Sequence, residues 1–147
     1  MYTPHTVSLY NTTITETADY EETTTQHITV LRGVFLDHVQ GVNLQTSGLV
    51  NADRAVLHIP LSIVARNAVT GQIQHYVSPA AYAAAADKSC IWTLSDAGSF
   101  FVKGEVAEAD KSFEYINSHY DNVYRISRVD LKDFGTYDMQ HYEVGGA

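Results

Sequence analysis

Short segments in which apolar and polar residues alternate constrain the fold of this chain more than any other feature. In the clearest of them, residues 55–63, Ala, Leu, Ile, Leu and Ile occupy one face and Val, His, Pro and Ser the other. This alternation predicts a β-strand with one face in the core and the other towards solvent. Because Pro60 has no backbone N–H, we expect it at a sheet edge or at an irregularity of the strand.

Similar segments recur along the chain. The glycine at position 33 predicts a bulge that lets one long strand bend around a barrel. Ser95-Asp96-Ala97-Gly98 predicts a hairpin between the strands on either side of it. The Thr-rich, acidic residues 11–22 are typical of a solvated hairpin connection. The further predicted strands cover residues 6–10, 23–38, 72–77, 90–94, 99–106, 123–129 and 137–144.

Two short helices complete the predicted elements. Ser78 and Pro79 suit the cap and first position of a helix that continues through alanines to residue 86. Asp110 can cap a second helix, in which Phe113 and Ile116 begin an apolar stripe. With 147 residues, 45% of them hydrophobic, the chain suffices for one core. The predicted fold is therefore mainly β, a small β-barrel or sandwich with one or two short helices, in a single domain over residues 1–147.

Charge and composition narrow the possible partners. The net charge of −8 disfavours a surface that grips nucleic acid by neutralising its phosphates. The first residues show no export signal, and no apolar stretch approaches the ~20 residues of a membrane-spanning helix. We therefore expect a protein without a membrane partner that is made in a cytoplasm. Cys90 precedes an apolar run and is predicted to be a buried, unreactive thiol.

No residue pattern of a catalytic, metal or cofactor site is visible, so an enzyme is not expected. The sequence contains neither a Gly-x-Ser-x-Gly motif nor a phosphate-binding Gly-rich loop. Ten tyrosines and one tryptophan keep open an aromatic-rich carbohydrate-binding module as an alternative of another class. Seven histidines are scattered singly, without the i, i+4 spacing of a helical metal site: His5, His27, His38, His58, His75, His119 and His141.

The order of the segments resembles that of tailed-phage head-closure proteins, also called stoppers or head–tail connectors. An early strand is followed by a polar hairpin, a longer strand, a long loop and a regular strand, and then by two aromatic segments and a late strand. The residues that carry this resemblance are His5 to Asn11, Thr29 to Leu36, Ala55 to Pro60, Ile91 to Leu94, Phe100 to Gly104 and Asn122 to Ile126.

The resemblance implies a virion structural protein whose copies form a ring that closes the DNA-filled head and docks the tail. Its partners would be further copies, the portal-adaptor and tail proteins, and packaged DNA passing without a specific contact. A tail terminator or tail-completion protein is the nearest alternative. An acidic channel wall would let DNA slide.

Two segments are candidates for the assembly contacts. The longest predicted loop covers about residues 37–54, and loops of this length are often functional. The C-terminal tail, residues 145–147, is expected to be flexible. The candidate assembly or channel loop is Gly41, Val42, Asn43, Leu44, Gln45, Thr46, Ser47 and Gly48, and the candidate docking arm is Tyr142, Glu143 and Val144.

Overall fold

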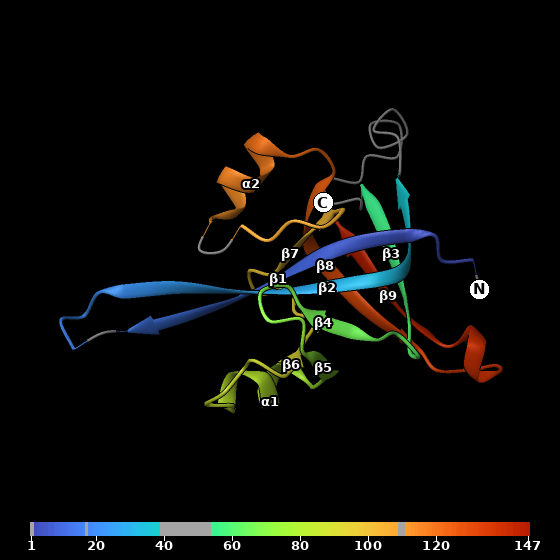
Figure 1. Ribbon diagram of the computed structural model, residues 1–147, viewed down its shortest axis with the longest axis horizontal. Coiled ribbons are helices and arrows are strands. Elements are labelled where there is room, and N and C mark those ends of the chain that lie inside the picture. The colour runs from blue at the N-terminus through green and yellow to red at the C-terminus, as the bar shows by residue number, and fades with distance from the viewer. Residues whose placement is uncertain (1, 17, 39–53, 109–110) are drawn as a thin grey trace.

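The computed structural model describes residues 2–16, 18–38, 54–108 and 111–147, and it confirms a mainly β fold (Figure 1). The helices are α1 (Pro79–Ala84), α2 (Phe113–His119) and the 3-10 helix η2 (Tyr137–Met139). The strands are β1 (His5–Glu16), β2 (Glu22–His38), β3 (Ala55–Pro60), β4 (Ala65–Asn67), β5 (Ile73–Tyr76), β6 (Ile91–Trp92), β7 (Phe100–Lys103), β8 (Val123–Lys132) and β9 (His141–Gly146).

Six strands form a closed barrel. Their pairing runs β1-β7-β8-β9-β3-β2, and β2 pairs in turn with β1, which closes the circle. The short strands β4, β5 and β6 form a branch of the sheet, in which β4 pairs with β2, β5 with β4, and β6 with β5. Because the circle is closed, each of the six strands has a partner on both sides. Their paired residues are therefore protected from pairing with other chains.

The long strand β2 takes part in this closure because it bends at Gly33. His5 lies opposite Val34, whereas the next residue, Thr6, lies opposite Arg32, so Gly33 is the extra residue of a bulge. Its φ of 94° is one that residues with a side chain rarely adopt. Beyond the bulge, β2 pairs with β3 from Phe35 onwards. The predicted bulge is confirmed.

Apolar side chains pack on both faces of the barrel wall. In β7, Phe101 belongs to the main core, whereas Phe100 and Val102 belong to a second cluster that includes Ile116 of α2. The helix thus covers the outside of β7. The main core contains Val7, Leu9, Leu31, Val34, Leu36, Ala55, Leu57, Ile59, Ala65, Trp92, Leu94, Phe101, Tyr124, Ile126 and Val144.

The first helix begins as predicted but ends at Ala84 rather than at residue 86, and the second helix begins slightly differently. The Ser78 hydroxyl accepts a hydrogen bond from the Ala81 N–H, and Pro79 opens α1. The N-cap of α2 is Ser112, whose hydroxyl accepts from the Tyr115 N–H. The predicted cap Asp110 lies outside the described residues.

Two local predictions are wrong. The segments around residues 90–94 and 99–106 do not form a hairpin: β6 pairs in parallel with β5, and β7 lies between β1 and β8. Non-local partners outcompete the short connection because they bury the aromatic residues of β7 on both faces. Cys90 is exposed rather than buried, since it precedes β6 instead of pointing into the core.

The C-terminal prediction also needs correction. Tyr142, Glu143 and Val144 lie in β9, which is hydrogen-bonded to β3 on one side and to β8 on the other. Gly145 and Gly146 continue that strand and are buried, and Ala147 exchanges two backbone hydrogen bonds with Arg125, of 2.9 and 3.0 Å. The segment is therefore an internal barrel strand and not a free docking arm with a flexible tail.

Candidate functional site

The most prominent feature outside the barrel is a two-stranded arm, formed by residues 11–16 and 18–27. The pairing of β1 with β7 ends at Tyr10, and the pairing of β2 with β4 begins only at Thr29. Between these points the two strands pair only with each other, as far as Glu16 opposite Glu22. Figure 1 shows this arm reaching well beyond α1 and α2.

The base of the arm is fixed to the body by polar contacts. Asn11 is buried, and its side-chain amide donates to the Thr93 carbonyl at 2.9 Å while its oxygen accepts from the Thr93 N–H at 3.3 Å. The Thr12 hydroxyl donates to the Gly98 carbonyl at 3.1 Å. These bonds set the direction in which the arm leaves the barrel.

The outer part of the arm is exposed and acidic. Ile14 is 65% exposed, and Tyr20, in the turn, is 86% exposed. The first Lys or Arg of the chain is Arg32, so the arm carries neither lysine nor arginine. Its carboxylate residues are Glu16, Asp19, Glu21 and Glu22.

A groove lies between the base of the arm and α2. It brings a lysine and an arginine close to the arm, which has neither. Arg125 forms an exposed ion pair with Glu114 at 2.9 Å and lies 4.2 Å from the centre of the Phe113 ring. Its lining includes Thr12, Thr24, Gln26, Asp96, Lys111, Phe113 and Arg125.

The sequence-predicted site residues fall in two places. The candidate loop Gly41–Gly48 lies outside the described residues. Of the three predicted docking residues, Val144 is buried in the main core and Tyr142 packs its ring 4.8 Å from that of Tyr76. Glu143 faces outwards and takes part in a second feature of the surface.

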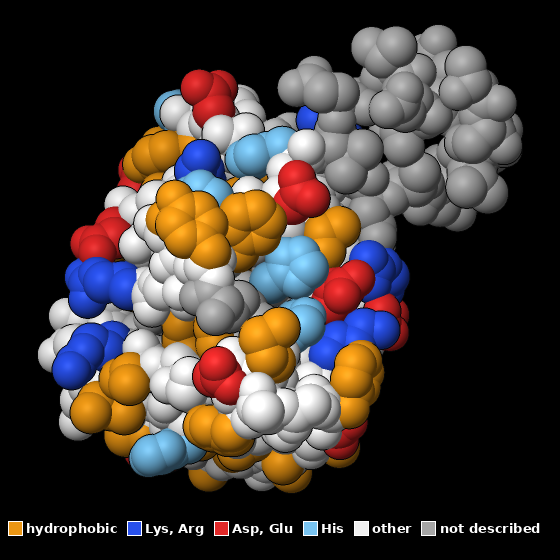
Figure 2. All heavy atoms as spheres, turned by 90° about the vertical axis from the view of Figure 1, so that its right-hand side faces the viewer, with side chains coloured by type: hydrophobic (Ala, Val, Ile, Leu, Met, Phe, Trp, Pro, Cys, Tyr) orange, Lys and Arg blue, Asp and Glu red, His pale blue; other side chains and the backbone are white. Residues whose placement is uncertain are grey.

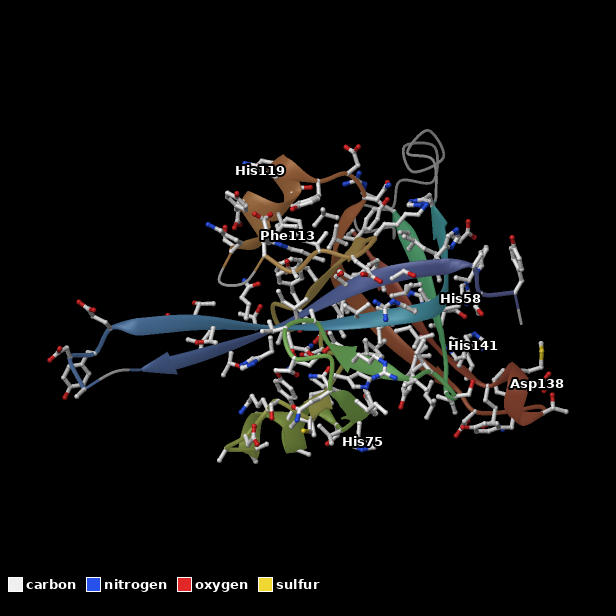
Figure 3. The ribbon with its side chains drawn as sticks, in the orientation of Figure 1. His58, His75, Phe113, His119, Asp138 and His141 are labelled. Atoms are coloured by element: carbon white, nitrogen blue, oxygen red, sulfur yellow. The ribbon has the colours of Figure 1, made fainter. Side chains whose placement is uncertain are left out.

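That second feature is a cluster of His58, His141 and Glu143 on the outer face of the barrel. His58 lies directly opposite Glu143 in the β3–β9 ladder, and His141 is two residues before Glu143 on the same face. One possible ligand atom from each residue lies within 4.8 Å of the others, and the two imidazole rings are 5.3 Å apart (Figure 3). All three side chains are half-buried.

Hydrogen bonding and burial orient the two imidazoles. The Nδ1 of His141 lies 2.9 Å from the Met139 carbonyl, which can only accept, so Nδ1 carries the proton and donates. Its Nε2 then faces Glu143 Oε2 at 3.8 Å. Burial lowers the pKa of His58 and so favours its neutral form. The charge of Glu143 acts in the opposite direction but has a smaller effect.

The cluster continues into an ion-pair network on β8. Arg128 pairs with Asp130 at 2.5 Å and lies 3.5 Å from Glu143. On the other side, the Phe35 ring is 5.8 Å from that of His58. Figure 2 shows histidine, carboxylate and basic side chains side by side on this face.

Sequence reasoning anticipated the arm only in part and missed the histidine cluster. Residues 11–22 were expected to be a solvated hairpin connection, and their many threonines also suit the strands of a longer ribbon, which was not expected. For the histidines, alternation places His58 and His141 on the outer faces of their strands, but no sequence signal shows that these strands are neighbours.

The fold and its projections define a class: a small closed β-barrel with a projecting two-stranded arm. The chain belongs to the family of unknown function DUF6751, whose model matches residues 2–147. No curated protein and no solved structure matches the chain. Among the described residues, no helix has both the length and the apolar character needed to cross a membrane.

Proposed function

We propose that this chain is a non-enzymatic structural subunit of the head–tail junction of a tailed-phage particle. Copies made in the host cytoplasm would form a ring that closes the DNA-filled head and docks the tail. The observation that carries the proposal is the projecting arm, together with the resemblance of the segment order to head-closure proteins. The portal-adaptor and tail proteins are the proposed neighbours of the ring.

The arm supports a role in assembly because of its energetics. An isolated two-stranded ribbon is marginally stable in water, so contact with a further surface would stabilise it. The exposed Ile14 and Tyr20 offer apolar contacts for such a surface. When the arm of one copy binds a different surface of the next, the contact is heterologous and can close into a ring.

Charge indicates the receiving surface. The arm carries four carboxylates and no lysine or arginine, whereas the groove beside it is lined by Lys111 and Arg125 with a single carboxylate, Asp96. We propose that the arm of one copy lies along this groove of its neighbour. The same acidic character suits a ring that surrounds DNA without gripping it, and the loop Gly41–Gly48 stays a proposed channel-facing element.

Particle fractionation tests the proposed location. Particles of the phage that encodes the chain are dissociated into DNA-filled heads and free tails, and each fraction is analysed by peptide mass spectrometry. Recovery of the chain with heads, at a few copies per particle, is the expected result. Recovery with tails would favour the tail-terminator alternative, and absence from both fractions would contradict a virion role.

A charge-swap experiment tests the proposed ring contact. Reversing the charge of the arm, with Asp19→Lys, Glu21→Lys and Glu22→Lys, should strongly reduce the yield of infectious particles. Reversing the charge of the groove, with Lys111→Glu and Arg125→Glu, should do the same. Combining both sets should restore part of the yield, because attraction replaces repulsion. Arg66→Glu with Lys103→Glu, an exposed pair elsewhere, is the matched control. Loss of yield without rescue would reject the arm-in-groove contact, and normal yield in the arm variant would reject the arm's role.

A further inference from the structure

The cluster of His58, His141 and Glu143 has a composition that the proposed structural role does not require. Two imidazoles and one carboxylate on one face, with possible ligand atoms within 4.8 Å of one another, match the ligand types of zinc sites. We propose that these three residues form a binding site for a divalent metal ion of the zinc class on the outside of the barrel.

The distances fit after a small adjustment of side chains. Bonds of about 2.0–2.1 Å in a tetrahedral site place neighbouring ligand atoms roughly 3.3 Å apart. The present separations of up to 4.8 Å therefore need to close by about 1.5 Å. Rotation about the χ angles of these half-buried side chains would supply this movement, since β3 and β9 are already held in register by backbone pairing.

The orientation of His141 resembles that of a metal ligand. Its Nδ1–H donates to the Met139 carbonyl, and this kind of second contact fixes the tautomer of metal-bound histidines. Its Nε2 lone pair then faces the Glu143 carboxylate at 3.8 Å. Two acceptors that face each other are stabilised when a cation, a proton or a metal ion, lies between them.

The neighbouring charges decide which ion suits the site. Arg128 lies 3.5 Å from Glu143 but pairs more closely with Asp130, at 2.5 Å, so it can keep that partner when Glu143 turns to a metal. Two nitrogen ligands favour zinc-class ions over Ca²⁺ or Mg²⁺, which prefer oxygen. Three protein ligands leave a fourth position for water.

Titration of tag-free protein with Zn²⁺, monitored by calorimetry, tests the site. We expect one Zn²⁺ per chain and a rise in melting temperature that EDTA reverses, because the ion joins β3 to β9 only in the folded state. His58→Gln, His141→Gln and Glu143→Gln should each weaken binding at least about tenfold. His75→Gln, an exposed histidine of another strand, is the matched control and should bind normally.

Cobalt provides a readout that does not depend on stability. Co²⁺ bound by nitrogen and oxygen ligands in a tetrahedral site absorbs visible light much more strongly than aqueous Co²⁺. The wild type and the His75 variant should show this absorption, and a His58→Gln/His141→Gln variant should lose it while keeping the melting temperature of the metal-free wild type. Absence of Zn²⁺ binding by the wild type, or equal binding by all variants, would overturn the proposal.

Discussion

Gly146 lies where the barrel has no space for a side chain. A Cβ built at this residue would be 2.7 Å from the Cβ of Tyr124 and 2.9 Å from Cζ of Phe101. Real Cβ atoms do not approach that closely, so one of these aromatic residues would have to move within the packed core. The penultimate residue of the chain is thus part of the barrel wall.

Gly146→Ala should therefore destabilise the protein. We expect the free energy of unfolding to fall by about 1–3 kcal/mol, which is the usual cost of overpacking a core. Urea denaturation followed by tryptophan fluorescence measures the change, and Ala147→Gly, at the exposed neighbour, should have a much smaller effect. Equal stability of Gly146→Ala and wild type would show that β9 ends before this residue.

Asn11 shows that a sequence alone does not reveal which polar side chains are buried or what they bind. It reads as a loop residue because asparagine favours turns, and it follows an apolar segment. In the structure it is buried, and its side chain binds both the N–H and the C=O of Thr93 in the way that a neighbouring strand would. Buried polar groups need such partners, and the partner here comes from a distant part of the chain.

At the scale of elements, the bulge in β2 separates the part of the strand that pairs with β4 from the part that pairs with β3. Gly33→Ala should lower the free energy of unfolding by about 1–3 kcal/mol, because alanine at φ of 94° is strained. Thermal and urea unfolding measure the effect. Arg32→Ala is the control: it removes an exposed ion pair with Glu105 and should lower the free energy of unfolding much less than Gly33→Ala does. If both variants were equally stable, the bulge would not constrain the strand.

Elements with a strong local signal could be predicted from the sequence. The strand at residues 55–63 and the capped helix after Ser78 follow from alternation and from capping chemistry, and both are present, with the strand ending at Pro60. Pro60 is the last residue of β3 and pairs only with His141 of β9, which explains why a residue without N–H is tolerated. The expected hairpin around residue 96 is wrong because loop chemistry does not decide which strands become neighbours.

The same reason explains why the sequence did not predict the cluster of His58, His141 and Glu143. Histidine spacing reveals a metal site when both ligands lie on one helix, but His58 and His141 come from strands in opposite halves of the chain. Only the pairing of β3 with β9 places them together. A single sequence carries no direct signal for that pairing.

At the scale of the whole molecule, barrel and arm should differ in local stability. Amides of β1 from Val7 to Tyr10 lie between β2 and β7, whereas those beyond Thr12 lie in the ribbon alone. We expect native-state hydrogen exchange of the barrel amides to require global unfolding, and the arm amides to exchange faster through local opening. NMR at low protein concentration measures this, and equal protection of both parts would show that the arm is not an independent extension.

The shared strands also determine how the molecule would respond to force. A pull on the tip of the arm acts along β1 and β2, the two strands that close the barrel. Such a pull shears the ladders to β7 and β4 lengthwise, so that many hydrogen bonds resist together instead of opening one after another. If the arm joins neighbouring copies as proposed above, the barrel wall itself would carry the tension between them.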